Sequence, residues 1–384
     1  MPTARIPHFC LIVPWIAVWM VSLPSISPLL AADPIVVATG KDKLAPMEPQ
    51  AAIDEHGTIH LAYGVGNRVF YCRSTDRGKS FEPGKEIASV PNLSLGMRRG
   101  PRIVAASGIV AVSIIGGEQG KGRDGDLLVW NSKDGGSHWN GPAMVNHATG
   151  SAREGLHSMA ISHQGTIWCT WLDLRNKKTE VFVSSSSDGG KTWKANDVAY
   201  ESPEKNVCEC CHPTIAVSGE GVGVMFRNSL KGNRDMYVAI AKNGKEFAPA
   251  FKLDAESWKL NACPMDGGMM VLNANGEFDA AWMRNGAVYQ SNSNAKGEEF
   301  LGKGNQPWIA KLGGKAMVAW TSGKRGDLNI FGGPYLEKRV IQGDCSNPCI
   351  ASGGSEKSAL AVVCWESRNQ GESSIHVLPV QAAP

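Results

Sequence analysis

The chain has 384 residues, a formal net charge of +3 at pH 7 and 20% charged residues. This near balance excludes a strongly basic nucleic-acid-binding protein and gives no reason to expect an anionic membrane surface as partner. The 44 glycines and 12 tryptophans, with few apolar residues at helical spacing, are typical of many short strands joined by tight turns.

The first 32 residues have the pattern of an export signal. Arg5 and His8 precede an apolar run over residues 9–21, and Ala31 and Ala32 supply small residues for cleavage. The run is too short for a stable membrane span. We therefore expect a signal peptide at 1–32, with a retained N-terminal anchor as the alternative. One periplasmic or secreted domain would then occupy residues 33–384.

A short motif recurs three times, each time after a segment that alternates like a β-strand. Residues 74–81, 132–139 and 186–193 share the pattern Ser-x-Asp-x-Gly-x-x-aromatic, and eroded copies occupy 242–247 and 293–300. In a hairpin turn, the Asp side chain accepts hydrogen bonds from its own turn and the Gly takes a positive φ. We therefore assign structural roles to Asp76, Asp134 and Asp188.

The strands around these motifs repeat as seven modules. Each module has a second strand rich in Ala, Val and Trp, at residues 59–63, 109–115, 167–172, 222–226, 278–283, 317–321 and 359–365. The last module lacks a fourth strand, which residues 35–38 can supply. This pattern predicts an all-β fold, a β-propeller of four-stranded antiparallel blades closed by the N-terminal strand. Seven blades are expected, with six as the alternative.

The three motifs resemble the Asp boxes, or BNR repeats, of the sialidase-like propellers. The resemblance extends over essentially all of the chain after the signal and implies the propeller fold. It implies less about activity, because Asp boxes also occur in proteins that are not sialidases. The segment Cys-Glu-Cys-Cys-His at 208–212 is similar to an uncharacterised exported bacterial branch of this family.

Strand order places the unusual polar residues on one face of the predicted propeller. The loops between blades, and those joining second to third strands, emerge opposite the Asp boxes, and such a face is the default binding site. Several arginines there favour an anionic ligand, because guanidinium groups pair with carboxylate or sulfate. The candidate ligand-binding residues are Arg99, Arg102, Arg153, Arg175, Arg227, Arg234 and Arg284, with Trp258 for stacking on a sugar ring. The alternative is that these arginines form structural pairs with neighbouring acids.

Sialidases bind a substrate carboxylate through three arginines and use an Asp as acid/base with a Tyr–Glu pair. The resemblance implies Arg102 or Arg99, Arg227 and Arg284 as carboxylate ligands. It implies Asp173, Glu154 or Asp266 as the acid/base. The Phe/Tyr-Arg-Ile-Pro motif of sialidases is missing after the signal, and Tyr335 and Glu366 are the nearest options for the pair.

The leading functional hypothesis is therefore a monomeric propeller that recognises, and in its enzymatic form hydrolyses, an acidic glycan or other anionic small molecule. The first alternative is a non-catalytic glycan- or protein-binding scaffold. The second is a metal-binding propeller.

Nine cysteines follow the signal, an odd number that leaves at least one thiol unpaired. Export favours disulfides, for example from Cys210 or Cys211 to Cys263, and then no cofactor is expected. The alternative is a copper or zinc site built from thiolates and an imidazole. Its candidate ligands are Cys208, Cys210, Cys211, His212 and Cys263.

Overall fold

The computed structural model describes Met1 and residues 33–253, 255–273, 275–354 and 359–381. The predicted signal peptide lies, but for Met1, outside the described residues. Apart from one short 3-10 turn, η1 (Asp42–Leu44), every element in these ranges is a β-strand. No helix in the described ranges has the length and apolarity to cross a membrane. The all-β prediction is confirmed.

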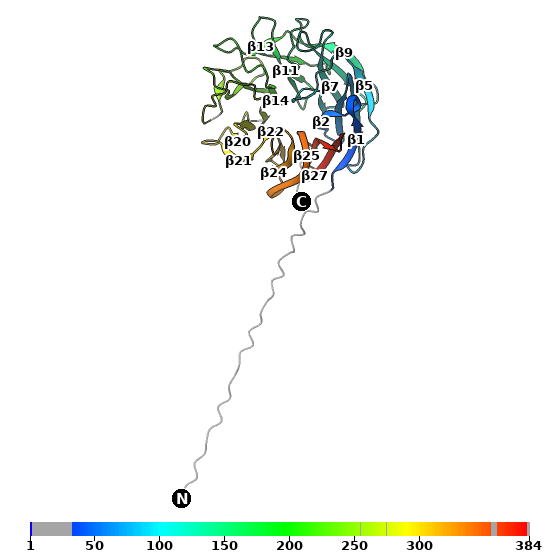
Figure 1. Cartoon of the computed structure of the whole chain (residues 1–384), viewed down its shortest axis with the longest axis vertical. Helices are drawn as coiled ribbons and strands as arrows, with labels where there is room; N and C mark the ends of the chain where they lie inside the picture. Colours follow the sequence, from blue (N-terminus) through cyan, green and yellow to red (C-terminus); the bar gives the residue numbers. More distant parts are fainter. Residues whose placement is uncertain (2–32, 254, 274, 355–358, 382–384) are drawn as a thin grey trace. The chain divides into compact units, whose positions relative to one another are not determined.

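Five antiparallel sheets each contain four strands that follow one another in the chain (Figure 1). They are β2 (Met47–Ile53), β3 (Ile59–Val65), β4 (Arg68–Ser74) and β5 (Lys85–Ser89); β6 (Arg102–Ala106), β7 (Ile109–Gly116), β8 (Asp126–Ser132) and β9 (Asn140–Met144); β10 (His157–Ile161), β11 (Ile167–Asp173), β12 (Glu180–Ser186) and β13 (Asp197–Tyr200); β14 (Thr214–Ser218), β15 (Gly221–Arg227), β16 (Met236–Ala241) and β17 (Phe251–Lys252); and β18 (Met269–Leu272), β19 (Phe278–Arg284), β20 (Ala287–Asn292) and β21 (Glu299–Lys303).

A sixth sheet has seven strands, in the order β1-β27-β26-β25-β24-β23-β22. Its members are β1 (Ile35–Lys41), β22 (Asn305–Leu312), β23 (Lys315–Thr321), β24 (Gly326–Gly332), β25 (Tyr335–Gly353), β26 (Leu360–Asn369) and β27 (Glu372–Gln381). The long strand β25 pairs with β24 through its first part and with β26 from Cys345 onward. Strand β1 pairs with β27, so the predicted pairing of residues 35–38 with the last strand is confirmed.

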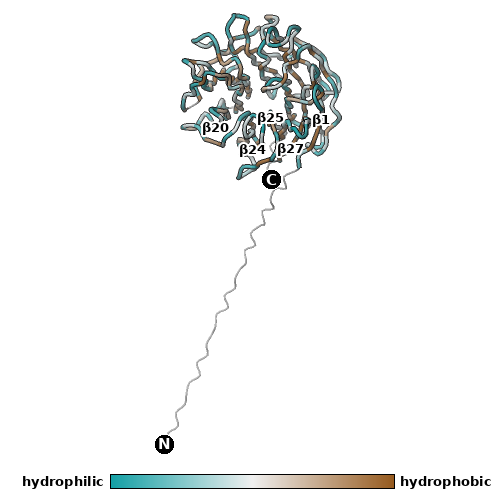
Figure 2. Tube along the Cα trace, viewed as in Figure 1, coloured by the Kyte–Doolittle hydropathy of each residue, from teal (hydrophilic) through white to brown (hydrophobic). Residues whose placement is uncertain are grey.

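The sheets follow one another around a centre, as in a propeller (Figure 1). The first strand of each four-stranded sheet contacts the first strand of the next, from β2 to β18, and β22 and β25 continue the series back to β2. The seven predicted second strands are found as β3, β7, β11, β15, β19, β23 and β26. Many of their Val, Ile and Trp side chains are buried in the core, and Figure 2 shows hydrophobic stretches alternating with hydrophilic ones along the chain trace.

The three Asp boxes are turns that join the third and fourth strands of the first three sheets. In the third box, Ser186 Oγ donates to Asp188, and the backbone amides of Lys191 and Thr192 also donate to this carboxylate. Gly190 has φ 88°, a conformation that a side chain would strain. Asp76 and Asp134 have the same kinds of partners in their own turns. The structural role predicted for these residues agrees with this geometry.

Candidate functional site

A cavity of about 230 Å³ opens among the loops that join successive sheets. Its walls come from the loop before β6, the loop before β18, the start of β22, the loop after β23, and strands β25 and β26. The lining residues include Met97, Met265, Asp266, Gln306, Lys324, Arg325, Asn347, Glu366 and Arg368. No Asp-box residue lines it, so this cavity lies among the loops expected to carry the binding site.

Two acidic side chains, Asp266 and Glu366, line this cavity and are joined by a chain of hydrogen bonds. The backbone amide of Gln306 donates to Asp266 Oδ2 at 2.6 Å, and the Gln306 side-chain amide donates to Asn347 Oδ1 at 3.2 Å. Asn347 Nδ2 in turn donates to Glu366 Oε1 at 2.9 Å. The two carboxyl groups are therefore held in fixed relation by residues of β22 and β25.

The two carboxyl groups differ in their remaining hydrogen bonds. Glu366 Oε1 also accepts from the backbone amide of Glu48 at 2.6 Å, and Oε2 accepts from Ser346 Oγ at 3.3 Å. Asp266 Oδ1 is buried and has no hydrogen-bond partner among the described residues. Burial raises the pKa of both carboxyls above the ordinary range, although hydrogen bonds and nearby arginines oppose this shift. A buried acid with a raised pKa and a free oxygen is suited to donating a proton.

A buried charged network lies behind the cavity. Burial, and then repulsion from Glu366, raise the pKa of Glu48 to about 8. Its Oε1 accepts from the backbone amide of Arg98 at 3.0 Å. The Arg98 guanidinium donates to the Pro307 carbonyl at 3.1 Å and lies over the Trp308 ring. Arg102 donates to the carbonyl oxygens of Arg98 and Pro101. This network positions the backbone around Glu366.

Three cationic residues, Lys324, Arg325 and Arg368, line the same cavity. Lys324 and Arg368 are exposed, whereas Arg325 is partly buried and donates to Asp344 at 2.6 Å and to Ser346 Oγ at 3.1 Å. Positive charge at the entrance of a cavity attracts anionic groups and favours their binding.

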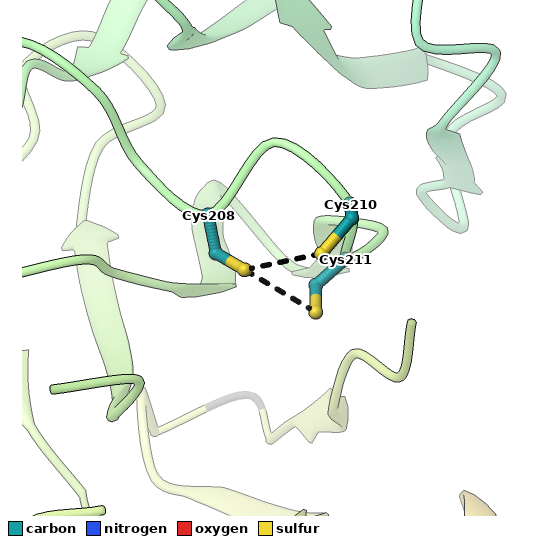
Figure 3. Close-up of side chains that lie close together, drawn as sticks. All are labelled: Cys208, Cys210 and Cys211. Atoms are coloured by element: carbon teal, nitrogen blue, oxygen red, sulfur yellow. Dashed lines mark hydrogen bonds between the residues drawn. The ribbon is translucent and has the colours of Figure 1, made fainter. Parts of the chain in front are cut away.

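A second polar site lies in the loop between β13 and β14. The sulfurs of Cys208, Cys210 and Cys211 converge there, and all three side chains are buried (Figure 3). Burial raises the pKa of the Cys211 thiol to about 12. His212 is buried beside them, but its Nε2 faces Arg98 at 3.5 Å and it does not belong to the sulfur group. A Cβ at Gly267 would lie 2.3 Å from the His212 carbonyl oxygen, so only glycine allows the loop before β18 to approach this segment.

The BNR repeat-like domain family matches residues 32–298 of the chain. The protein belongs to this family. The family contains the Asp-box propellers, so the predicted resemblance is confirmed, whereas the exported bacterial branch stays a prediction. A search of curated protein sequences found no match.

Solved structures of glycoside hydrolases have a similar fold. An α-L-arabinanase from Penicillium chrysogenum, complexed with arabinobiose, has a TM-score of 0.55 and 12% identity over 90% of this chain and 98% of its own. The α-L-arabinofuranosidase Arb93A from Fusarium graminearum has a TM-score of 0.54 and 11% identity over 91% and 98%. Trypanosoma rangeli sialidase has a TM-score of 0.51 and 10% identity over 88% and 54%. At these identities, the likeness establishes the fold alone.

Of the predicted acid/base residues in this BNR repeat-like protein, only Asp266 lines the cavity. Asp173 is fully buried, and its carboxylate accepts from Trp171, Ser151 and the Arg175 guanidinium at 2.7 to 2.9 Å. These contacts leave it as the centre of a structural ion pair. Glu154 is half-buried and does not line the cavity, although burial raises its pKa.

The predicted arginines lie outside the cavity lining, and most have internal partners. Arg227 donates to the carbonyl oxygens of Arg234, Met283 and Asp266, and its guanidinium lies 5.3 Å from the Trp258 ring. Arg284 pairs with Glu298, Arg175 with Asp173, and Arg99 with the Glu154 carbonyl. Arg102 belongs to the buried network, Arg153 is exposed, and the carbonyl oxygen of Arg234 accepts from Arg227. This geometry favours the structural alternative for Arg102, Arg175, Arg227 and Arg284.

Several residues that line the cavity were not predicted as ligands from the sequence. Glu366 was predicted only as the partner of a tyrosine, and Arg368 was not predicted; both lie near the end of β26, the second strand of the last module. Lys324 and Arg325 occupy the loop after β23, and Gln306 and Asn347 lie in β22 and β25. A search of every such loop for charged residues would have found these cations.

The predicted cysteine sites are only partly assembled. All nine described cysteines are free thiols, so the disulfide expected between Cys263 and Cys210 or Cys211 is not formed in this structure. Cys263 is exposed and outside the group of converging sulfurs. The physical reason is that Cys210 and Cys211 point into the protein toward Cys208, while Cys263 faces solvent.

Proposed function

We propose that this protein binds an acidic glycan in the cavity and hydrolyses one of its glycosidic bonds. The observation that carries the proposal is the pair of buried carboxyl groups, Asp266 and Glu366, held on one cavity by Gln306 and Asn347. Glycoside hydrolysis uses two carboxyl groups beside the scissile bond, one as proton donor and one as base or nucleophile.

Asp266 serves as the proton donor in this proposal. Burial raises its pKa, which favours the protonated form, and Oδ1 has no hydrogen-bond partner among the described residues. The proton passes to the leaving oxygen as the bond to the anomeric carbon breaks. Glu366, oriented by three donors, takes a proton from the water that attacks this carbon.

The acidic character of the ligand follows from the cations of the cavity. Lys324, Arg325 and Arg368 can pair with a carboxylate or sulfate while the carboxyl pair faces the glycosidic bond. No tyrosine is among the described residues that line the cavity. This favours two-carboxyl chemistry over the tyrosine chemistry that the resemblance to sialidases implied.

We also infer a ring of seven blades. The seven-stranded sheet divides at Cys345 of β25, which gives one blade of β22, β23, β24 and the first part of β25, and another of the rest of β25, β26, β27 and β1. Strand β1 then closes the ring. The export pattern of residues 1–32 supports a periplasmic or secreted location, which cell fractionation would test.

The test is hydrolysis of a panel of fluorogenic glycosides, namely α-L-arabinofuranoside, sialoside, glucuronide and galacturonide, by the full chain. We expect turnover of at least one acidic glycoside and a loss of about 100-fold or more in both Asp266→Asn and Glu366→Gln. Glu246→Gln, at an exposed position outside the cavity, is the matched control and should keep full activity.

Two results would overturn this proposal. Turnover that is unchanged in Asp266→Asn and Glu366→Gln would place the chemistry elsewhere. Binding of an acidic oligosaccharide without any turnover would exclude hydrolysis and support the non-catalytic scaffold.

A further inference from the structure

Three cysteines in four consecutive residues direct their sulfurs to one point. Cys208 Sγ lies 3.6 Å from Cys210 Sγ and 3.6 Å from Cys211 Sγ (Figure 3). All three sulfurs lie within 4.8 Å of one another, and the three side chains are at most 6% exposed. The intervening Glu209 is exposed. The turn therefore places the three thiol groups in the interior and the Glu209 carboxylate at the surface.

The spacing of the sulfurs is that of ligands to one metal ion. A disulfide bond is about 2.05 Å long, far shorter than the observed separations. Metal–thiolate bonds of about 2.3 Å place the sulfurs of one ion about 3.8 to 4.0 Å apart. The observed 3.6 Å is within a few tenths of an ångström of that arrangement. Two sulfurs can form a disulfide, but the third would still be buried beside it.

The loop before β18 adds another sulfur-containing side chain, that of Met265, beside the three cysteines. The Met265 side chain packs against the three cysteines. Met265 has φ 58°, a conformation that is unusual for a residue with a side chain.

Burial disfavours thiolates at this site, and two guanidinium groups partly oppose that effect. The positive charge of Arg227 acts on both Cys208 and Cys211, and the Cys208 backbone amide donates to the Arg227 carbonyl at 2.9 Å. The positive charge of Arg98 also interacts with Cys211. Three thiolates with a monovalent ion carry a charge of −2, which these guanidinium groups partly offset.

The types of donor atom at this site indicate which metal ion it prefers. Thiolates and thioethers favour Cu(I), whereas zinc commonly completes a four-coordinate site with imidazole, carboxylate or a fourth thiolate. His212 adjoins the cysteines in sequence, but its Nε2 faces Arg98 and it lies outside the sulfur group. The donors that meet at this point are therefore sulfurs only.

We propose that Cys208, Cys210 and Cys211 bind one Cu(I) ion, with the Met265 thioether as an additional weak ligand. Binding deprotonates the thiols and releases their protons to solvent. The site does not depend on the proposed hydrolysis. It also links the loop of residues 208–211 to the loop that carries Asp266.

The experiment uses the full chain, reduced and kept without oxygen, and titrates Cu(I) in competition with the chelator bicinchoninate. We expect one Cu(I) per chain. The variants Cys208→Ser, Cys210→Ser and Cys211→Ser should each lose about 100-fold or more in affinity, and Met265→Leu should lose a few-fold. Cys263→Ser and Cys169→Ser are the controls, one exposed and one buried outside the group, and should bind as the wild type does.

A second measurement does not depend on the folding of variants. Wild-type protein with and without one equivalent of Cu(I) is alkylated by iodoacetamide under mild denaturant, and labelled sites are identified by mass spectrometry. Cu(I) should protect Cys208, Cys210 and Cys211, whereas Cys263 should react equally in both samples. Binding that is no stronger than that of the chelator, protection of other cysteines, or a preference for Zn(II) over Cu(I) would overturn the assignment.

Discussion

The carboxyl groups of the Asp boxes and those of the cavity have the same chemistry in opposite surroundings. In the box turns, the hydroxyl and amide of Ser80 hold the pKa of Asp76 well below its usual range, and the amide and ring of His138 do the same for Asp134. In the cavity, burial raises the pKa of Asp266 and Glu366, and behind the cavity it raises the pKa of Glu48.

The difference teaches how one fold separates structure from reactivity. A carboxylate that accepts hydrogen bonds from its own turn is stabilised as an anion and stays inert. A carboxyl that loses water without gaining enough donors retains its proton and becomes a usable acid. The repeated motif thus marks the carboxylates held in their own turns, whereas the carboxyl groups that we propose as reactive occupy positions that do not repeat.

The largest expected effect comes from the same substitution in both regions. Asp266→Asn should lower kcat of the glycoside that the protein cleaves by about 10³-fold, because the amide cannot donate the proton as an acid. Asp188→Asn should leave kcat within about two-fold, because Asp188 contacts only its own turn. Steady-state kinetics of the two variants measures this difference. Equal losses of kcat in both variants would contradict the separation between box and cavity carboxyl groups.

The next effect concerns stability against pH. Between its ordinary pKa of 4.5 and about 8, Glu48 keeps its proton in the folded state but loses it in the unfolded chain. The free energy of unfolding of the wild type should therefore fall as pH rises through this window, by on the order of 3 kcal/mol. Glu48→Gln removes this pH-dependent contribution. The free energy of unfolding of the variant, measured in urea, should therefore exceed that of the wild type by an amount that grows from pH 5 to pH 8. A constant difference across the window would contradict a buried, protonated Glu48.

A box carboxylate should have the opposite pH dependence and a smaller effect. Slight burial opposes ionisation of Asp188, but hydrogen bonds from Thr192, Ser186 and Lys191 lower its pKa to about 2. Its stabilising contribution is then present above pH 4 and is lost as pH falls toward 2. Asp188→Asn should cost about 1.5 kcal/mol at pH 7, and less at pH 2, in thermal unfolding. An equal loss of unfolding free energy at both pH values would mean that the charge of Asp188 does not stabilise the fold.

The smallest effect should come from the cations of the cavity. Arg368→Gln should raise KM for an acidic glycoside about five-fold at low salt and less at 0.5 M salt, because an exposed cation is screened. A neutral glycoside should be unaffected. Lys191→Gln, which removes a charge from a box turn, is the control. An unchanged KM in Arg368→Gln would remove Arg368 from the ligand contacts.

Much of the fold was predictable because its determinants are local. Each second strand, such as residues 167–172, has a pattern of apolar residues and pairs with the strands that come directly before and after it in the chain. The box turn at 186–193 is formed by partners at most four residues apart. Residues 35–38 were assigned to the last sheet because that module lacked a strand.

The candidate site was predictable only in part. Asp266 and the loops of the cavity were expected, but Asp173 was an equal candidate for the acid/base, and the structure holds it in an ion pair with Arg175. Arginines favoured as ligands, such as Arg227 and Arg284, have buried internal partners instead. The sequence indicates where an arginine lies along a strand. It does not indicate whether its guanidinium donates to a distant carbonyl oxygen, as Arg227 does to that of Met283.

The sequence alone determined the family, the strand order and the face that carries unusual residues, because these depend on short repeating patterns. Only the tertiary structure decided which polar groups meet, such as Asp266 with Gln306 and Gln306 with Asn347, because these hydrogen bonds join residues about 40 positions apart. It also decided that Cys208, Cys210 and Cys211 converge while Cys263 does not. The physical reason is that pKa and ligand geometry depend on burial and on neighbours from other sheets, which no local pattern encodes.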